Sequence, residues 1–181
     1  AENVPVCGPV EHVKPERLFQ FTLRLRQRHG LRLIPSDGPM IGLFRALRRG
    51  EVVCLPCDRD IADNSRMIDF FGSPARLPDG PVRVALRTGV PIVPVFASRL
   101  PDDTFAIHIE PPLDMPETGD HETDVRLAMH EVVKVLERHI ARQPEQWLVV
   151  SPVWPVDGNQ APQSADENYD KILRPLSRKG Q

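Results

Sequence analysis

Apolar positions along the chain alternate between short continuous runs, which predict strands, and runs that repeat every three to four residues, which predict helices. The expected strands cover residues 4–10, 31–34, 52–55, 90–96 and 105–109. The expected helices cover residues 15–30, 36–50, 79–89 and 120–140. Because helices alternate with strands too apolar for an exposed face, this order predicts an α/β fold with a mostly parallel sheet flanked by helices.

Polar side chains that suit a helix N-cap precede three of these helices: Ser36 or Asp37, then Asp79, then Asp120. Residues 57–69 are expected to form a loop. From residue 157 to residue 181 the sequence is polar and contains prolines, which is typical of a tail without a packed core. The sequence therefore predicts one domain over residues 1–156, followed by a polar tail over residues 157–181.

The apolar content and the charge distribution limit the kinds of partner that the protein is expected to have. No stretch approaches the roughly 20 uninterrupted apolar residues of a membrane span, so any contact with a membrane is expected to be peripheral. The formal net charge is −2, but residues 1–100 hold 15 Lys and Arg against 10 Asp and Glu. Only four basic residues are lysines. Arginine suits bidentate contact with phosphate or carboxylate, so the first half indicates either an anionic small molecule or a solvated basic face.

Three cysteines, an odd number, argue against a disulfide scaffold and for a reducing compartment. Cys54 and Cys57 match the C-x-x-C spacing of redox and zinc sites. A redox pair places its first thiol at a helix N-terminus, whereas Cys54 lies in an expected strand. A zinc site needs further ligands at matching spacing, and the sequence has none. A half-buried structural pair is the favoured interpretation.

The densest polar cluster is Asp58-Arg59-Asp60, at the carboxyl end of an expected buried strand. Ligands of open α/β sheets bind outside the carboxyl ends of their strands. Burying two carboxylates and a guanidinium in such a loop is costly without partners. The cluster is therefore either a ligand site or a surface ion-pair cluster that organises the loop.

None of the six histidines fits the His-x4-Asp/Glu spacing with which acyltransferases orient a catalytic base. The positions five residues further on hold Arg17, Ile34, Leu113, Arg126, Val135 and Pro144. There is no Gly-x-Ser-x-Gly for a serine nucleophile and no glycine-rich phosphate loop. The residues present do not supply a complete catalytic set for acyl transfer.

Phe70, Phe71 and Gly72 form a compact motif before Pro74. The two aromatic rings either line an apolar groove or plug the core beneath a loop. The nearby arginines Arg76, Arg83 and Arg87 are candidates for contact with an anionic group.

An ordered set of short motifs links these observations. It comprises Glu11-x-x-Lys14-Pro15-Glu16-x-Leu18-Phe19, Arg26-x-x-x-Gly30, Cys54-Leu55-x-x-Asp58-Arg59-Asp60, Asp69-Phe70-Phe71-Gly72-x-Pro74, Gly80-Pro81, Val90-Pro91-Ile92-Val93-Pro94 and Pro144-x-x-Trp147. In this order the motifs resemble the lipid A biosynthesis lauroyl/myristoyl acyltransferase family, and most of all its phosphatidylinositol mannoside acyltransferase branch. The resemblance runs from about residue 4 to residue 155.

The resemblance implies a glycerolipid acyltransferase-like α/β fold whose N-terminal elements are missing here. It implies transfer of a fatty acyl chain from acyl-CoA or acyl carrier protein to a hydroxyl of a glycolipid or phospholipid. No cofactor, metal or nucleic acid is implied. The protein is expected on the cytoplasmic face of the cell membrane as a peripheral protein. The family's His-x4-Asp/Glu motif lies before the first strand of this chain, so the chain alone is expected to be inactive.

The resemblance also implies roles for individual residues. Asp58 matches the acidic residue that works with the family histidine, although the mannoside branch carries Glu there. Glu11 and Arg26 match charged residues on the headgroup side of the groove. Arg59 and Asp60 match the loop that flanks it. In the acyltransferase hypothesis, Phe70 and Phe71 are expected to edge the acyl groove, Gly72 to allow the turn and Arg76 to meet an anionic group. The alternative is a non-catalytic lipid- or headgroup-binding relative that has lost the histidine.

Overall fold

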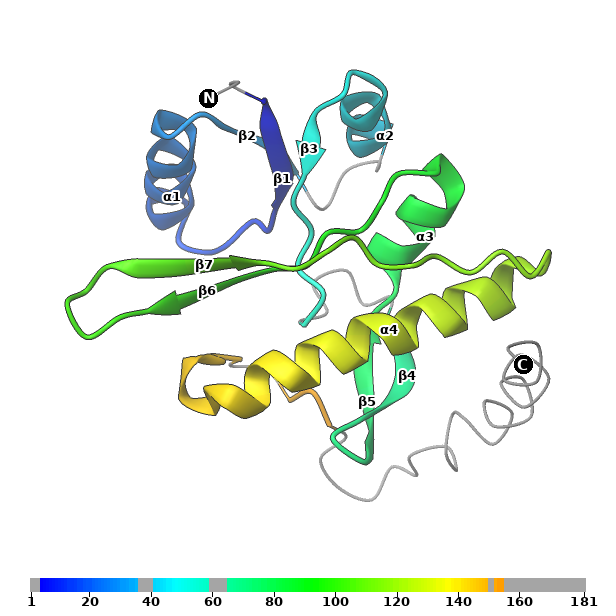
Figure 1. The fold of residues 1–181 in the computed structure, drawn as a ribbon. Helices are drawn as coiled ribbons and strands as arrows, with labels where there is room; N and C mark the ends of the chain where they lie inside the picture. Colours follow the sequence, from blue (N-terminus) through cyan, green and yellow to red (C-terminus); the bar gives the residue numbers. More distant parts are fainter. Residues whose placement is uncertain (1–3, 36–40, 59–64, 150–151, 155–181) are drawn as a thin grey trace.

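The protein is described by a computed structural model that covers residues 4–35, 41–58, 65–149 and 152–154 (Figure 1). Over these ranges it is an α/β structure with a parallel sheet and two antiparallel hairpins. The strands are β1 (Val6–Val10), β2 (Leu31–Pro35), β3 (Val52–Val53), β4 (Ser65–Phe70), β5 (Ser73–Pro78), β6 (Val95–Arg99) and β7 (Phe105–Ile109). The helices are α1 (Glu16–Arg28), α2 (Ile41–Arg48), α3 (Gly80–Thr88), α4 (His121–Arg142) and the 3₁₀ turn η1 (Pro144–Gln146). The predicted fold class is confirmed.

The parallel sheet has the order β2-β1-β3, with β1 in the centre. The chain leaves β1 through α1 to reach β2 on one side, and then returns through α2 to β3 on the other side. Figure 1 accordingly shows α1 and α2 on the two sides of β1. The order of the strands therefore reverses between β1 and β3, which is the topological switch point of an open α/β sheet.

The β4–β5 hairpin corrects the expectation of a loop over residues 57–69, because a strand begins at Ser65. Its buried positions, Ile68 and Phe70, alternate with more exposed ones, as in a half-buried strand. A two-residue turn, Phe71-Gly72, joins the strands with φ values of 51° and 74°. Two positive φ values are those of a type I′ turn, whose twist matches that of a hairpin.

The β6–β7 hairpin corrects the expected strand over residues 90–96. Regular pairing begins only at Val95 and continues to Arg99. Pro91 and Pro94 lack the N–H that a regular ladder needs. Ahead of β6 only isolated bonds remain, such as the one from Leu113 N–H to the Ile92 carbonyl at 2.9 Å. The neighbouring strand predicted over residues 105–109 is confirmed.

The main core lies between α4 and the β4–β5 hairpin (Figure 1). The α4 helix begins as predicted, because the Asp120 carboxylate accepts a hydrogen bond from Thr123 N–H at 2.9 Å. The Asp79 carboxylate does not cap α3, since Arg83 and Arg66 bind it instead. The predicted cap at Ser36 or Asp37 and the tail over 157–181 lie outside the described residues.

Candidate functional site

Two acidic residues follow strands of the parallel sheet. Glu11 directly follows β1, and Asp58 follows β3 by five residues. The segment after β3 stays beside β1, because Cys54 N–H donates to the Cys7 carbonyl at 2.8 Å. A Cβ atom on Gly8 would lie 2.9 Å from the Cys54 carbonyl oxygen, so glycine permits this close approach. The chain thus enters the Asp58 turn at the switch point, where open α/β sheets bind ligands.

Asp58 is held by a tryptophan from the far end of the described chain. Trp147 donates its indole N–H to Asp58 Oδ2 at 3.1 Å, and both side chains are partly buried. The Trp147 ring contacts the Phe70 ring edge-on at 5.7 Å between centroids. Trp154 stacks on Phe70 at 5.6 Å and donates its indole N–H to the Phe70 carbonyl at 3.2 Å. The carboxylate therefore has a fixed orientation imposed by an aromatic cluster of Phe70, Trp147 and Trp154.

Cys57 directly precedes Asp58 and is not poised to ionise. Burial, and to a lesser degree the negative charge of Asp58, raise the pKa of the Cys57 thiol to about 12. Cys54 is exposed, so the interpretation of both cysteines as a half-buried pair is wrong for this residue. A redox dithiol needs a thiol of lowered pKa, and Cys57 has the opposite.

The structure does not bring Arg26 to the carboxyl edge of the sheet, where Glu11 follows β1. The α1 helix starts after β1 at the carboxyl edge and runs back beside the sheet, so its last turn lies near the start of β2. Arg26 is in this last turn and exposed. The 13 residues of α1 span about 20 Å, which separates Arg26 from Glu11 along the sheet. Arg59 and Asp60 lie outside the described residues.

Phe70 and Phe71 have different environments although they are neighbours. Phe70 is fully buried and belongs to the core. For this residue the structure agrees with the second interpretation of the motif, in which an aromatic ring plugs the core. Phe71 is 44% exposed, and its ring lies 4.7 Å from that of Phe70. Its backbone N–H donates to Glu137 Oε1 of α4 at 2.5 Å. Of the two rings, only Phe71 is open to a ligand from outside.

The arginines around this motif differ in their availability. The Arg76 side chain is exposed on β5, and its backbone N–H donates to the Val153 carbonyl at 2.9 Å. The Arg83 guanidinium is already neutralised, because it binds Asp79 at 2.8 Å and Glu122 at 2.7 Å. The Arg87 guanidinium lies over the Phe44 ring, 5.4 Å from its centroid. Arg76 is therefore the best placed of the three for an anionic ligand.

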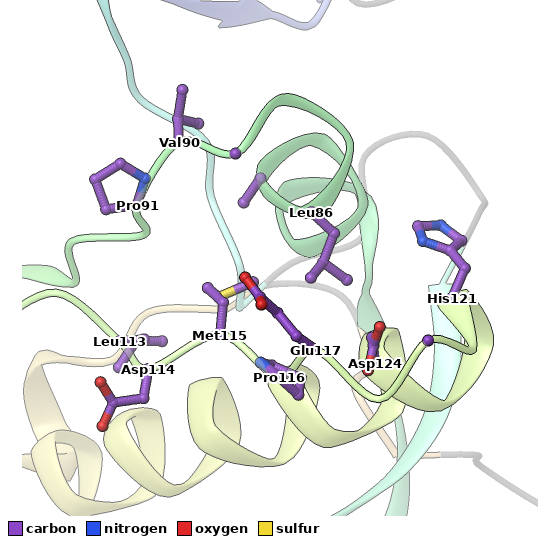
Figure 2. Close-up of a pocket in the computed structure, with 13 residues that line it drawn as sticks. Leu86, Val90, Pro91, Leu113, Asp114, Met115, Pro116, Glu117, His121 and Asp124 are labelled. Carbon is purple, nitrogen blue, oxygen red and sulfur yellow. The ribbon is translucent and has the colours of Figure 1, made fainter.

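A pocket of about 700 Å³ lies between the end of α3 and the segment that leads into α4 (Figure 2). Its apolar side is formed by Leu86, Val90, Pro91, Leu113 and Met115, and its polar side carries Asp114, Glu117, His121 and Asp124. Pro91 belongs to the Val90–Pro94 motif of the sequence analysis. Asp58 is not among the lining residues, so this pocket and the Asp58 turn are separate features.

Comparison with known proteins decides the family. A model of the bacterial lipid A biosynthesis acyltransferase family matches residues 3–155. The chain belongs to this family. Within the acyltransferase family, it is 30% identical over 154 residues to a phosphatidylinositol mannoside acyltransferase of Mycobacterium tuberculosis, covering 81% of this chain and 46% of the relative. It is 28% identical over 157 residues to the Mycolicibacterium smegmatis protein of the same name, covering 84% of this chain and 50% of the relative.

The resemblance stated from the ordered motifs is thereby confirmed at the level of the family. The chain spans about half the length of the curated relatives that it matches. Among the described residues, no helix combines the length and the apolar character needed to cross a bilayer. The structure adds one contact that the motifs alone did not reveal. Trp147 stood in the motif Pro144-x-x-Trp147 without a role, and its indole binds Asp58.

Proposed function

We propose that the protein containing this chain transfers a fatty acyl group from acyl-CoA or acyl carrier protein to a hydroxyl of a glycolipid or phospholipid. One observation carries the proposal: within a chain of an acyltransferase family, Trp147 orients the Asp58 carboxylate in the segment that leaves β3 at the switch point of the sheet. The names of the mycobacterial relatives support a mannosylated phosphatidylinositol as one candidate acceptor.

The proposed chemistry needs a histidine from a segment outside these 181 residues. Its imidazole removes the proton of the acceptor hydroxyl, whose oxygen attacks the thioester carbonyl. The tetrahedral intermediate collapses, the carbon–sulfur bond breaks, and the thiolate leaves with a proton from the imidazolium. A carboxylate beside the imidazole orients the ring and stabilises its charged form, and such assistance contributes about 10²–10⁴ to the rate.

Asp58 is the proposed carboxylate. Trp147 occupies Oδ2, which leaves Oδ1 to accept the imidazole N–H. Trp147 is a neutral donor and orients the carboxylate without neutralising it, so within the described residues its negative charge remains available for the imidazolium. Glu11, which directly follows β1, is proposed to meet the polar headgroup, together with Arg59 and Asp60.

The acyl chain is proposed to run against the exposed face of Phe71. The buried Phe70 ring supports this face from below, and Gly72 completes the turn that presents it. Arg76, exposed on the adjacent strand, is proposed to meet an anionic group of the donor or acceptor. Arg26 lies toward the opposite edge of the sheet, so a role for it requires a ligand that extends along α1.

The test is an assay of thiol release on the longer protein that carries this chain together with a His-x4-Asp/Glu motif. Palmitoyl-CoA serves as the donor, and phosphatidylinositol mannoside, phosphatidylinositol and lysophosphatidic acid serve as acceptors in separate reactions. Acceptor-dependent release of CoA with formation of an acylated lipid is the expected result. Tight binding of an acceptor without any acylated product, in a folded protein, would instead establish a non-catalytic lipid-binding relative.

A further inference from the structure

Three side chains that can bind a metal converge where the β6–β7 hairpin meets α4. His108 lies on β7, Glu110 directly follows it, and His139 lies in the last turns of α4. Their ligand atoms all lie within 4.8 Å of one another. His139 Nε2 is 2.6 Å and His108 Nε2 is 3.1 Å from the same atom, Glu110 Oε1. Among the described residues, no other group of three such side chains comes together.

The hydrogen bonds of this cluster converge on a single atom. Arg138 also binds Glu110 Oε1, at 2.9 Å, so three nitrogen donors surround one carboxylate oxygen. A carboxylate oxygen offers two lone pairs, and the carboxylate has a second oxygen to share the donors. Two imidazole nitrogens and one carboxylate oxygen are also a ligand set that zinc uses in proteins.

The cluster is partly preorganised. The His139 ring stacks on the Phe96 ring, with centroids 3.8 Å apart and the planes 8° from parallel. The side chains of His139 and Glu110 are only 11% and 15% exposed, whereas that of His108 is 59% exposed. Two ligands are therefore held in place, and the third lies at the solvent side where its ring has room to move.

We propose that His108, Glu110 and His139 form a binding site for a divalent transition metal, with Zn²⁺ as the preferred ion and water in the fourth position. Zinc bonds of about 2.0–2.2 Å require ligand atoms about 3.4 Å apart. Glu110 Oε1 and His139 Nε2, now 2.6 Å apart, must therefore separate as the ion enters, and the exposed His108 ring turns to complete the site. Arg138 lies outside the coordination sphere and stays bound to the carboxylate.

The metal would fasten the hairpin to α4. Every residue of β7 is exposed, so the described part of the protein gives this strand little apolar packing. Besides the packing of Phe96 of β6 on His139, the hairpin meets the end of α4 and the following turn through polar bonds, such as Ser98 to Gln143 at 2.6 Å and Arg99 N–H to Gln146 at 3.2 Å. A metal held by His108 and Glu110 of the hairpin side and by His139 of α4 would add a direct link across the same contact.

The experiment uses the 181-residue chain carrying Cys54→Ser, which removes the exposed thiol as a competing ligand. Zn²⁺ is titrated into chelator-treated protein by calorimetry, and Co²⁺ is titrated separately while the visible absorption of tetrahedral cobalt is recorded. Mg²⁺ is the negative control, because it prefers oxygen ligands. The ligand variants are His108→Gln and His139→Gln. The matched controls are His29→Gln, an exposed histidine at the end of α1, and Arg138→Gln.

One Zn²⁺ per chain, a Co²⁺ spectrum of tetrahedral type and no effect of Mg²⁺ are expected. The Zn²⁺ affinity falls at least tenfold in His108→Gln and His139→Gln, and it is unchanged or higher in Arg138→Gln and His29→Gln. Because His108 is exposed, its variant tests the site even if His139→Gln fails to fold. The proposal is overturned if the folded parent binds no Zn²⁺ at micromolar concentration, or if His108→Gln binds it as tightly as the parent.

Discussion

The indole N–H of Trp147 lies 3.1 Å from Asp58 Oδ2, and the two residues are 89 positions apart in the sequence. This bond joins the turn after the parallel sheet to the segment that follows α4. It also places the only carboxylate of the described turn against the aromatic cluster of Phe70, Trp147 and Trp154. The orientation of the proposed catalytic carboxylate therefore depends on how the end of α4 packs.

Replacing Trp147 by Phe tests this dependence. The variant keeps an aromatic ring next to Phe70 but removes the donor to Asp58. Loss of one hydrogen bond to a partly buried carboxylate is expected to cost about 1–3 kcal/mol in the free energy of unfolding, measured by urea denaturation. Trp154→Phe is the matched control, since it removes the bond to the Phe70 carbonyl and leaves Asp58 untouched. In the longer protein, only Trp147→Phe should lower kcat, by about tenfold, and equal kcat values for the two variants would argue against an orienting role.

Phe71 provides a second prediction, in which stability and activity change in opposite directions. Its φ of 51° is unfavourable for a bulky side chain, whereas Asn-Gly is the preferred pair for a type I′ turn. Phe71→Asn is therefore expected to raise the free energy of unfolding by about 1 kcal/mol. If Phe71 edges the acyl groove, the same change lowers kcat/KM for a long-chain acyl-CoA more than for a short-chain one. A variant that is more stable and shows no such chain-length effect would remove Phe71 from the groove.

Acid should weaken the contact between the hairpin β4–β5, α3 and α4. Hydrogen bonds from Arg83 and then Arg66 lower the pKa of Glu122 to about 2, below its ordinary value near 4.3. A lowered pKa in the folded state means that this carboxylate stabilises the fold above about pH 4.3 and that the stabilisation is lost as the pH falls toward 2. Glu122→Gln should therefore show a smaller loss of stability between pH 4.5 and pH 2 than the parent.

Thermal unfolding at a series of pH values measures this difference. Glu117→Gln is the control, because Glu117 is an exposed carboxylate on the segment just ahead of α4. It should retain the pH dependence of the parent. The same slope in Glu122→Gln and in the parent would mean that the ionisation of Glu122 contributes nothing to the stability of the fold.

The sequence predicted best what depends on local patterns. The periodic apolar positions of residues 120–140 and the cap at Asp120 gave α4 almost to its boundaries. The apolar run over 52–55 gave the position of β3, although regular pairing covers only Val52 and Val53. The β4 strand was not predicted because the charged residues Arg66 and Asp69 interrupt its apolar positions. Its alternation of buried and more exposed residues also covers only a short segment. The start of β6 was set too early because Val90–Pro94 is apolar but contains two prolines.

The contacts of the candidate site depend on distant parts of the chain. No local sequence signal connects Asp58 to Trp147. The motifs that carry the family resemblance give the order of these residues along the chain, but they do not indicate which residues are in contact. The environments of Phe70 and Phe71 could not be told apart from sequence, since both are large and aromatic. The turn that separates them, with one ring in the core and one outside, follows from the register of the β4–β5 hairpin. The convergence of His108, Glu110 and His139 was missed for the same reason, because it needs the hairpin to meet α4.

The most direct test of the account is the effect of Asp58→Asn on acyl transfer by the longer protein, compared with Asp103→Asn. Asp103 is exposed and has a positive φ that Asn tolerates, so its variant controls for the loss of one charge. We predict that Asp58→Asn lowers kcat by about 10²–10⁴ with little change in KM for the acyl donor, while Asp103→Asn retains the parent rate. A folded Asp58→Asn variant with the kcat of the parent would contradict the assignment of Asp58 as the carboxylate that supports the catalytic base.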